Sequence, residues 1–428
     1  MTVDQLKELA GAARRDPAGE LARLWANSLI RNALQLMSTT VATAGLGYVF
    51  WLLAARLATP HEVGLGAGLT SVATAVSVAV HLGGGMVLVE RLPRHERTGG
   101  WWPRLLAVLG IELGATVGVA LATAAVLGGH SGFAEALATP GRILVFTVGA
   151  VAWTGVNVLS YAFISLRRAG RGLAVNATVS AAKILIFVGS GGVFTSWALA
   201  GLAGLLVGAV LLPRWGVRPH TPPALRREVL GSFFWHHLTS CAGVLVPLLL
   251  PVLVVMRVSA EDNAYFYTTW MLGGIFLTVS QSVSSALFAE GSLAAAEVQR
   301  KLGTAARLIA ALLAVPVLLV LTAGAQILHI FGPGFAERGA LLLFALVGAA
   351  VPDGVTSLAV AVLRVRRRLR TAAHLNLAMS VVTLAGAWFL LPRLGIVGAG
   401  LAFLAAQSLG ALAVLPFLLS FRSRGVAA

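Results

Sequence analysis

Ionisable side chains inside long apolar segments are the residues of this sequence best suited to chemistry. Lys183 lies near the middle of VNATVSAAKILIFVG, and Glu112 lies in LLAVLGIELGATVG. An ionised side chain at the centre of a bilayer costs about 2.5–3.5 kcal/mol and persists only beside a partner or a polar cavity. We therefore expect both residues to face the protein interior. The alternatives are a position at the cytoplasmic interface for Glu112 and a structural pair with Asn157 for Lys183.

Further polar residues in apolar segments could bind protons or cations. Asp353 follows Pro352, which lacks a backbone N–H and can open a helix beside the carboxylate. Histidine titrates near neutral pH and can therefore carry protons. The predicted ion- or proton-coupling residues are Glu112, Asp353, His81, His236 and His237. The alternatives are a hydrogen-bonded acid in a bent helix and histidines at the membrane surface.

Two arginines end apolar segments at corresponding places in the chain, Arg56 and Arg257. Turned inward, they would offer bidentate hydrogen bonds to a phosphate. Turned outward, they would anchor their helices at the lipid headgroups. The predicted substrate-binding set is Arg56, Lys183, Arg257, Asn157 and Asn176.

The segments that carry these residues are long enough to cross a membrane. With 58% hydrophobic and 11% charged residues, the composition lies outside the range of soluble domains. A span needs about 20 apolar residues. Twelve segments fit, at about 32–55, 63–88, 105–127, 142–166, 173–193, 196–212, 230–256, 265–288, 306–330, 340–363, 371–391 and 396–420. The sequence therefore predicts an all-α integral membrane protein.

The chain repeats itself, because Arg56 recurs as Arg257 at almost the same offset as Asn176 recurs as Asn376. This favours two pseudo-symmetric six-helix lobes around a central cavity, a construction that transporters use; chance similarity between apolar helices is the alternative. The predicted parts are an amphipathic N-terminal segment (1–31), an N-lobe (32–212), a basic, proline-rich linker (213–229), a C-lobe (230–420) and a tail (421–428).

Lysine and arginine residues gather in the loops on one side of the predicted spans. By the positive-inside rule, both termini and the linker lie in the cytoplasm, and the protein spans the cytoplasmic membrane. The net charge of +16 does not indicate nucleic-acid binding, because the basic residues lie in short clusters between apolar spans. Cys241 is the single cysteine, which excludes an intrachain disulfide.

Enzyme motifs are absent from the sequence, which has no GxxxxGK[ST], CxxC or HExxH. The loops are also too short to hold a soluble catalytic domain. We therefore predict a transporter rather than an enzyme, without cofactor or metal. Helix breakers are predicted as hinges for lobe movement, although such residues are common in membrane helices in any case. These are Gly83, Gly84, Gly85, Pro247, Pro251 and Pro352.

Residues 47–93, GYVFWLLAARLATPHEVGLGAGLTSVATAVSVAVHLGGGMVLVERLP, resemble the opening of polysaccharide-export flippases of the multidrug/oligosaccharidyl-lipid/polysaccharide superfamily. The shared elements are a first span ending in Ala55-Arg56-Leu57, the turn at 59–64, and the three glycines before Val89-Glu90-Arg91. His61 stands where similar proteins often have an acid. By position, Arg56 matches the arginine at the end of that family's first span. The predicted roles of Lys183 and Arg257 depend only on the chemistry of their side chains.

The resemblance implies a V-shaped bundle of two lobes that exposes its cavity to each side of the membrane in turn. It implies a lipid-linked, polyprenyl-phosphate oligosaccharide, an anionic amphiphile, as cargo, with membrane lipids and glycan-assembly enzymes as partners. The alternative is a cation-coupled exporter of drugs or natural products from the same superfamily, with Glu112 or Asp353 essential. A cavity lined by lysine and arginine would favour the flippase, and one lined by carboxylates the exporter. A non-transporting scaffold or enzyme subunit is disfavoured by the buried charges.

Overall fold

The computed structural model describes residues 45–81, 88, 101–166, 168–212, 227–293 and 295–423, and these residues form helices joined by short turns. The first half contains helix Gly45–Leu57, α4 (Pro60–Val80), α6 (Trp101–Gly128), α7 (Ser131–Ala134), α8 (Pro140–Ser165), α9 (Ala169–Ser190) and α10 (Val193–Leu211). The second contains α11 (Arg227–Arg257), α12 (Ala260–Leu293), α13 (Ala295–His329), α14 (Pro333–Val365), α15 (Leu369–Leu394) and α16 (Ile396–Ser423).

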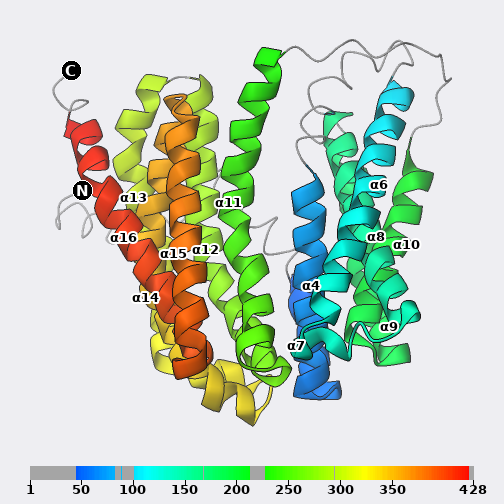
Figure 1. Cartoon of the computed structure of the whole chain (residues 1–428). Helices are drawn as coiled ribbons and strands as arrows, with labels where there is room; N and C mark the ends of the chain where they lie inside the picture. The colour runs from blue at the N-terminus through cyan, green and yellow to red at the C-terminus, as the bar shows by residue number, and fades with distance from the viewer. Residues whose placement is uncertain are drawn as a thin grey trace, which may run out of the picture.

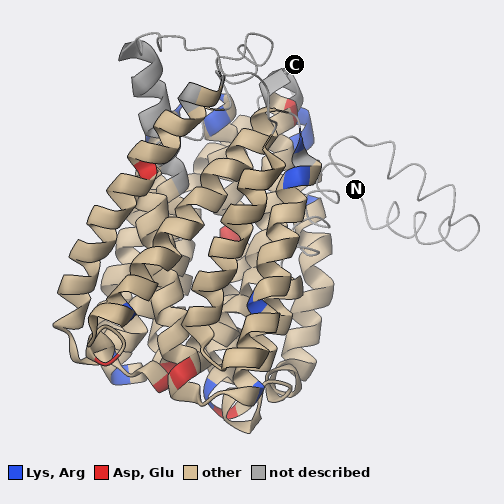
Figure 2. Cartoon of the chain, turned by 90° about the vertical axis from the view of Figure 1, so that its right-hand side faces the viewer, with Lys and Arg blue, Asp and Glu red and all other residues tan. Residues whose placement is uncertain are grey.

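Within the described residues, ten helices are long and apolar enough to cross a membrane, and two apolar helices, Gly45–Leu57 and Cys241–Arg257, are shorter. The shorter pair overlaps the predicted first and seventh spans, of which 32–44 lies outside the described residues. Figure 2 shows the charged residues gathered mainly at the two ends of the bundle, with few between. The predicted all-α membrane fold is confirmed, and the chain is a multi-pass membrane protein.

The helix ends refine the approximate boundaries of the predicted spans. The fifth span ends at Ser190 rather than 193, because Gly191 has a left-handed backbone (φ 72°) that stops α9 and lets α10 begin at Val193. The sixth span is therefore a full helix of 19 residues. Helix α4 ends at Val80, with His81 as its C-cap, and residues 82–87 of the predicted second span lie outside the described residues. The short helix α7 was not predicted.

The two halves begin their second helices with the same local structure. Thr59 caps α4: its backbone N–H donates to Glu62 Oε2 at 2.9 Å, and its hydroxyl accepts from Glu62 N at 3.3 Å. At α12, Ser259 Oγ accepts from Asp262 N at 2.9 Å and lies 2.6 Å from Asp262 Oδ2. In each case a hydroxyl side chain accepts from a backbone N–H group in the first turn of the helix, where no backbone acceptor is present. The repeat follows Arg56 and Arg257 in turn, which supports the duplication read from the sequence.

The helices form two lobes that stand side by side, with α11–α16 on the left of Figure 1 and α4–α10 on the right. In the second lobe α14 is central and packs against α12, α13 and α16; in the first, α8 packs against α6 and α10. Between the lobes, α4 contacts α11 and α12. Helix Gly45–Leu57 also contacts α12: the Tyr48 hydroxyl donates to Met271 O at 2.8 Å, and the ring centroids of Trp51 and Tyr267 lie 4.6 Å apart. The boundaries of the predicted N-terminal segment, linker and tail fall largely outside the described residues and stay predictions.

The lobes meet at one end of the bundle, where α4 and α12 begin. A Cβ atom on Gly64 would lie 1.6 Å from the carbonyl oxygen of Ala260, so the two backbones touch here. Asn263 is fully buried and its Nδ2 donates to Gly64 O at 2.7 Å. Gly132 of α7 approaches Val255 of α11 in the same way. Figure 1 shows this junction at the lower end, which the lysine and arginine distribution predicts to be the exterior.

Candidate functional site

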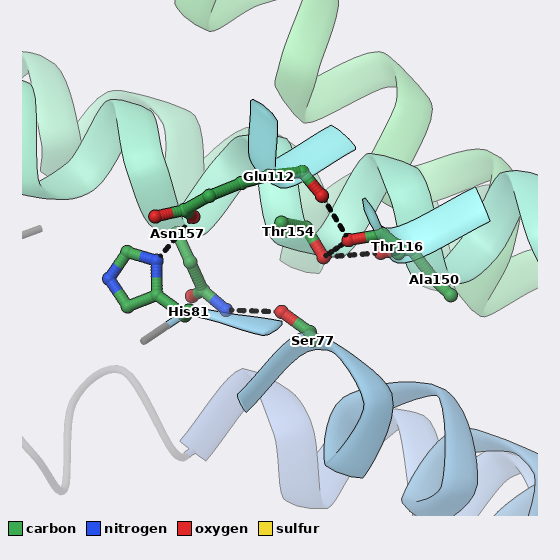
Figure 3. Close-up of polar contacts among 7 residues, drawn as sticks. All are labelled: Ser77, His81, Glu112, Thr116, Ala150, Thr154 and Asn157. Carbon is green, nitrogen blue, oxygen red and sulfur yellow. Dashed lines mark hydrogen bonds and ion pairs between the residues drawn. The ribbon is translucent and has the colours of Figure 1, made fainter. Parts of the chain in front are cut away.

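A buried histidine and carboxylate pair lies inside the N-lobe. His81 ends α4 and Glu112 belongs to α6; His81 Nδ1 lies 2.6 Å from Glu112 Oε2 (Figure 3). The two side chains are 14% and 7% exposed. At this separation they share a proton or form an ion pair, and each removes the cost of burying the other. The structure thus places two of the predicted coupling residues in direct contact.

The helices around this pair are tied together by further polar contacts. The ring of Tyr161 in α8 stacks on the His81 ring with 5.0 Å between centroids. Thr116 Oγ1 lies 2.7 Å from Glu112 O and 3.1 Å from Thr154 Oγ1 of α8. Asn157, also on α8, donates to Ser77 of α4 at 3.2 Å (Figure 3). The pair is therefore held where α4, α6 and α8 meet.

The second ring nitrogen of His81 takes no part in the contact with Glu112. This Nε2 atom is buried and has no hydrogen-bond partner among the described residues. Tyr161 is the other titratable side chain described in contact with the pair. The contact between His81 and Glu112 ties the end of α4 to α6.

The C-lobe contains an open cavity of about 300 Å³, with polar and apolar lining residues, between α11, α12, α14, α15 and α16. Two charged residues line it, Asp353 and Arg364, both from α14. Polar uncharged side chains make up much of the remaining wall, among them Gln281, Ser284, Ser285, Thr356, Asn376 and Gln407. A cavity so lined can hold a polar ligand that apolar membrane helices would otherwise exclude.

Asp353 lies deep in this cavity wall. It is 7% exposed, and its Oδ2 atom has no hydrogen-bond partner within the described part of the chain. Thr356 Oγ1 lies 3.0 Å from Asp353 O and 3.0 Å from Gln407 Oε1, which connects α14 to α16. Helix α14 runs through Pro352 without interruption, as α11 runs through Pro247 and Pro251. The hinge roles of these prolines stay predictions.

The predicted substrate-binding cations each contact a different element. Lys183 Nζ lies 4.8 Å from the centroid of the Phe50 ring, and the Arg257 guanidinium lies 4.3 Å from that of Trp388. Arg56 is exposed and its Nε donates to Ile330 O at 2.7 Å. The face of an aromatic ring attracts a cation, so these ring contacts partly offset the cost of removing Lys183 and Arg257 from water. None of the three lines the C-lobe cavity.

The two predicted asparagines differ in environment: Asn157 bonds to Ser77, whereas Asn176 is exposed on α9. Gly83, Gly84, Gly85 and the side chains of His236 and His237 lie outside the described residues. No group of three potential metal ligands occurs among the residues searched.

Sequence reasoning missed Arg364, Asn376 and Gln407. Arg364 lies close to the arginine run at 366–368, which has the composition of a cytoplasmic loop, yet it lines the cavity. Asn376 could have been found, because it repeats Asn176 in the second half. Gln407 carried the weaker signal of an amide within an apolar span.

Comparison with known proteins identifies the fold. The sequence matches no protein-family model and no curated protein. Among solved structures, an inward-facing multidrug resistance MATE family transporter of the MOP superfamily superposes with a TM-score of 0.68 at 16% identity, covering 90% of this chain and 95% of that one. An outward-facing structure of a transporter of that family gives 0.62 at 16% identity, covering 94% and 96%.

A third structure is a MOP superfamily transporter from Pyrococcus furiosus described as having a binding pocket of reverse polarity; it gives 0.62 at 15% identity, covering 94% and 96%. These likenesses extend over nearly the whole chain. They support the superfamily fold expected from residues 47–93 but not its polysaccharide-export branch. The fold of this chain is the two-lobed fold of MATE transporters of the MOP superfamily.

Proposed function

We propose that this chain is a membrane transporter, not an enzyme, that exports small amphiphilic molecules by alternating access and is driven by protons. The observation that carries the proposal is the His81–Glu112 pair, a titratable contact of 2.6 Å buried between helices of one lobe. In a membrane interior such groups are expensive and mark proton or substrate pathways. Two of the structures with this fold are described as multidrug resistance transporters, which favours the exporter over the flippase.

The arrangement of the lobes supports the mechanism. Junction contacts gather where α4 meets α12, so the lobes can rock about this end and open it while the other end closes. α4 carries both Gly64 at the junction and, at its other end, His81. Protonation of the pair would therefore act on the same helix that holds the lobes together, which gives a physical route from proton binding to lobe movement.

The test uses purified protein in liposomes with an imposed pH gradient and ethidium as the transported probe. We expect gradient-driven ethidium movement in the wild type and its loss in Glu112→Gln, which keeps the shape but not the charge. Glu62→Gln is the matched control, because Glu62 is an exposed carboxylate that caps α4. Equal transport by the wild type and Glu112→Gln would exclude the pair from coupling.

A second candidate function is the flipping of an anionic, lipid-linked glycan precursor. Lys183 favours it, because this cation is partly buried against Phe50, beside the lobe junction. The corresponding test is flipping of a fluorescent polyprenyl-phosphate sugar in the same liposomes. This reading expects Lys183→Ala to abolish flipping in a folded protein. Normal flipping by Lys183→Ala would remove Lys183 from that mechanism.

A further inference from the structure

The charged residues of the C-lobe cavity lie on one face of one helix. Asp353 and Arg364 are eleven residues apart on α14, and eleven steps of about 100° return to within roughly 20° of the starting direction. Ser357, Val360 and Ala361 lie between them on the same face and also line the cavity. The backbone positions of the two charges are about 16 Å apart along the helix. Helical side chains generally lean toward the N-terminus, which from Arg364 is the direction of Asp353, and both residues line the same cavity.

Among the described residues that line the cavity, Asp353 and Arg364 are the charged ones, so this part of the wall is acidic at one end and basic at the other. Each also keeps a buried atom, Asp353 Oδ2 and Arg364 Nε, without a hydrogen-bond partner among the residues described. A buried charge is stabilised when an opposite charge or a hydrogen-bonding group meets it. A ligand that carried both charges at matching distance would satisfy both ends at once.

We propose that the C-lobe cavity binds an elongated zwitterionic small molecule, with its cationic group at Asp353 and its anionic group near Arg364. The cavity volume of about 300 Å³ suits a metabolite rather than a polymer. The hydroxyl and amide groups of Ser284, Gln281 and Gln407 are placed to bond polar atoms along the molecule. The inference rests on the proposed transporter function only in making this ligand a transported substrate.

A simple cation is a poorer match. A single positive ion would pair with Asp353 and leave Arg364 unmatched, and no cluster of three acidic or metal-binding side chains exists within the described residues. A simple anion would leave Asp353 unmatched in the same way. The charge pattern therefore favours a molecule that carries two opposite charges, separated by a distance that matches the separation of Asp353 and Arg364.

Binding is tested on the full-length protein in detergent, by calorimetry and without any gradient. The probes are 4-aminobutanoate, 8-aminooctanoate, octylamine and octanoate. We expect 8-aminooctanoate to bind at least tenfold tighter than the other three, since a hydrogen bond to a charged group contributes about that factor. Octylamine binding as tightly as 8-aminooctanoate would overturn the proposal in favour of a cation site.

Two variants and two matched controls complete the test. Asp353→Asn and Arg364→Gln should each weaken 8-aminooctanoate binding about tenfold or more; Asp353→Asn should spare octanoate, and Arg364→Gln should spare octylamine. The controls are Glu337→Gln, an exposed carboxylate on α14, and Arg366→Gln, whose guanidinium lies 5.4 Å from the Phe421 ring. Unchanged 8-aminooctanoate affinity in Arg364→Gln refutes the inference.

The variants also separate this inference from the transporter proposal. If Asp353→Asn does not fold, Arg364→Gln and the chain-length comparison decide the question alone. Gradient-driven ethidium transport without any preference for 8-aminooctanoate would refute the zwitterion site and leave the transporter standing. Tight 8-aminooctanoate binding without transport in liposomes would support the site and refute the transporter.

Discussion

Replacing Gly64 with alanine tests whether the α4–α12 junction holds the lobes in the arrangement described. The new Cβ atom would lie 1.6 Å from Ala260 O and 2.8 Å from Ala264 N, where no real Cβ contact occurs, so the backbones must separate. Overpacking costs typically 1–3 kcal/mol. Separation would also leave Asn263 Nδ2 without its 2.7 Å acceptor, which costs about 1–3 kcal/mol more for a buried group.

Together these costs come to at least about 2 kcal/mol, a population shift of roughly thirtyfold toward the arrangement in which this junction is open. The assay is the distance between spin labels at Val210 of α10 and Leu419 of α16, two exposed positions near the ends of their helices away from the junction. The labels are attached to introduced cysteines after Cys241 is replaced by serine. We expect Gly64→Ala to shorten this distance as the lobes rock.

The control variant is Gly118→Ala on α6, because a Cβ there meets nothing within 4 Å. Both substitutions bring the same gain in helix propensity, about 1 kcal/mol, and only one of them disturbs the junction. A Gly64→Ala distance distribution that matches those of the wild type and Gly118→Ala would refute the idea that this contact controls lobe position.

Three further predictions concern single contacts. Asn263→Ala removes the junction hydrogen bond and should move the same spin-label distance in the direction of Gly64→Ala, by a smaller amount. Thr59→Ala removes the cap of α4 and should lower thermal stability by about 0.5–2 kcal/mol, measured by thermal unfolding in detergent; an unchanged midpoint would contradict the cap. Thr116→Val should reduce proton-driven ethidium transport less than Glu112→Gln does, because it disturbs the support of the pair rather than the pair; an equal loss would contradict that ranking.

Much of the fold could be predicted from the sequence because bilayer thickness imposes it. A segment of about 20 apolar residues has few alternatives to a spanning helix, and the repeat of Arg56 as Arg257 pointed to two halves. Helix ends were harder, because they depend on local backbone such as the left-handed Gly191. Hydropathy alone does not show that α9 ends at Gly191, because the segments on both sides of this glycine are apolar.

The sequence indicated which residues could belong to the candidate site, but it did not indicate which of them contact one another. Glu112 and His81 could be selected because both are polar residues in apolar segments, but the sequence does not show how α4 and α6 are rotated about their axes, and that rotation brings the two side chains together. Arg364 lies two residues before the run Arg366, Arg367 and Arg368, a pattern typical of a cytoplasmic loop. Only the direction of its side chain on α14 shows that it faces the cavity.

The most direct test of the central claim is proton movement itself. Liposomes that contain the wild-type protein and trapped pyranine, with no initial pH difference, should show a change in internal pH when ethidium is added outside. Liposomes with Glu112→Gln should show none, whereas those with Glu62→Gln should respond as the wild type does. An ethidium-dependent pH change of equal size in Glu112→Gln would contradict the claim that the buried His81–Glu112 pair couples protons to transport.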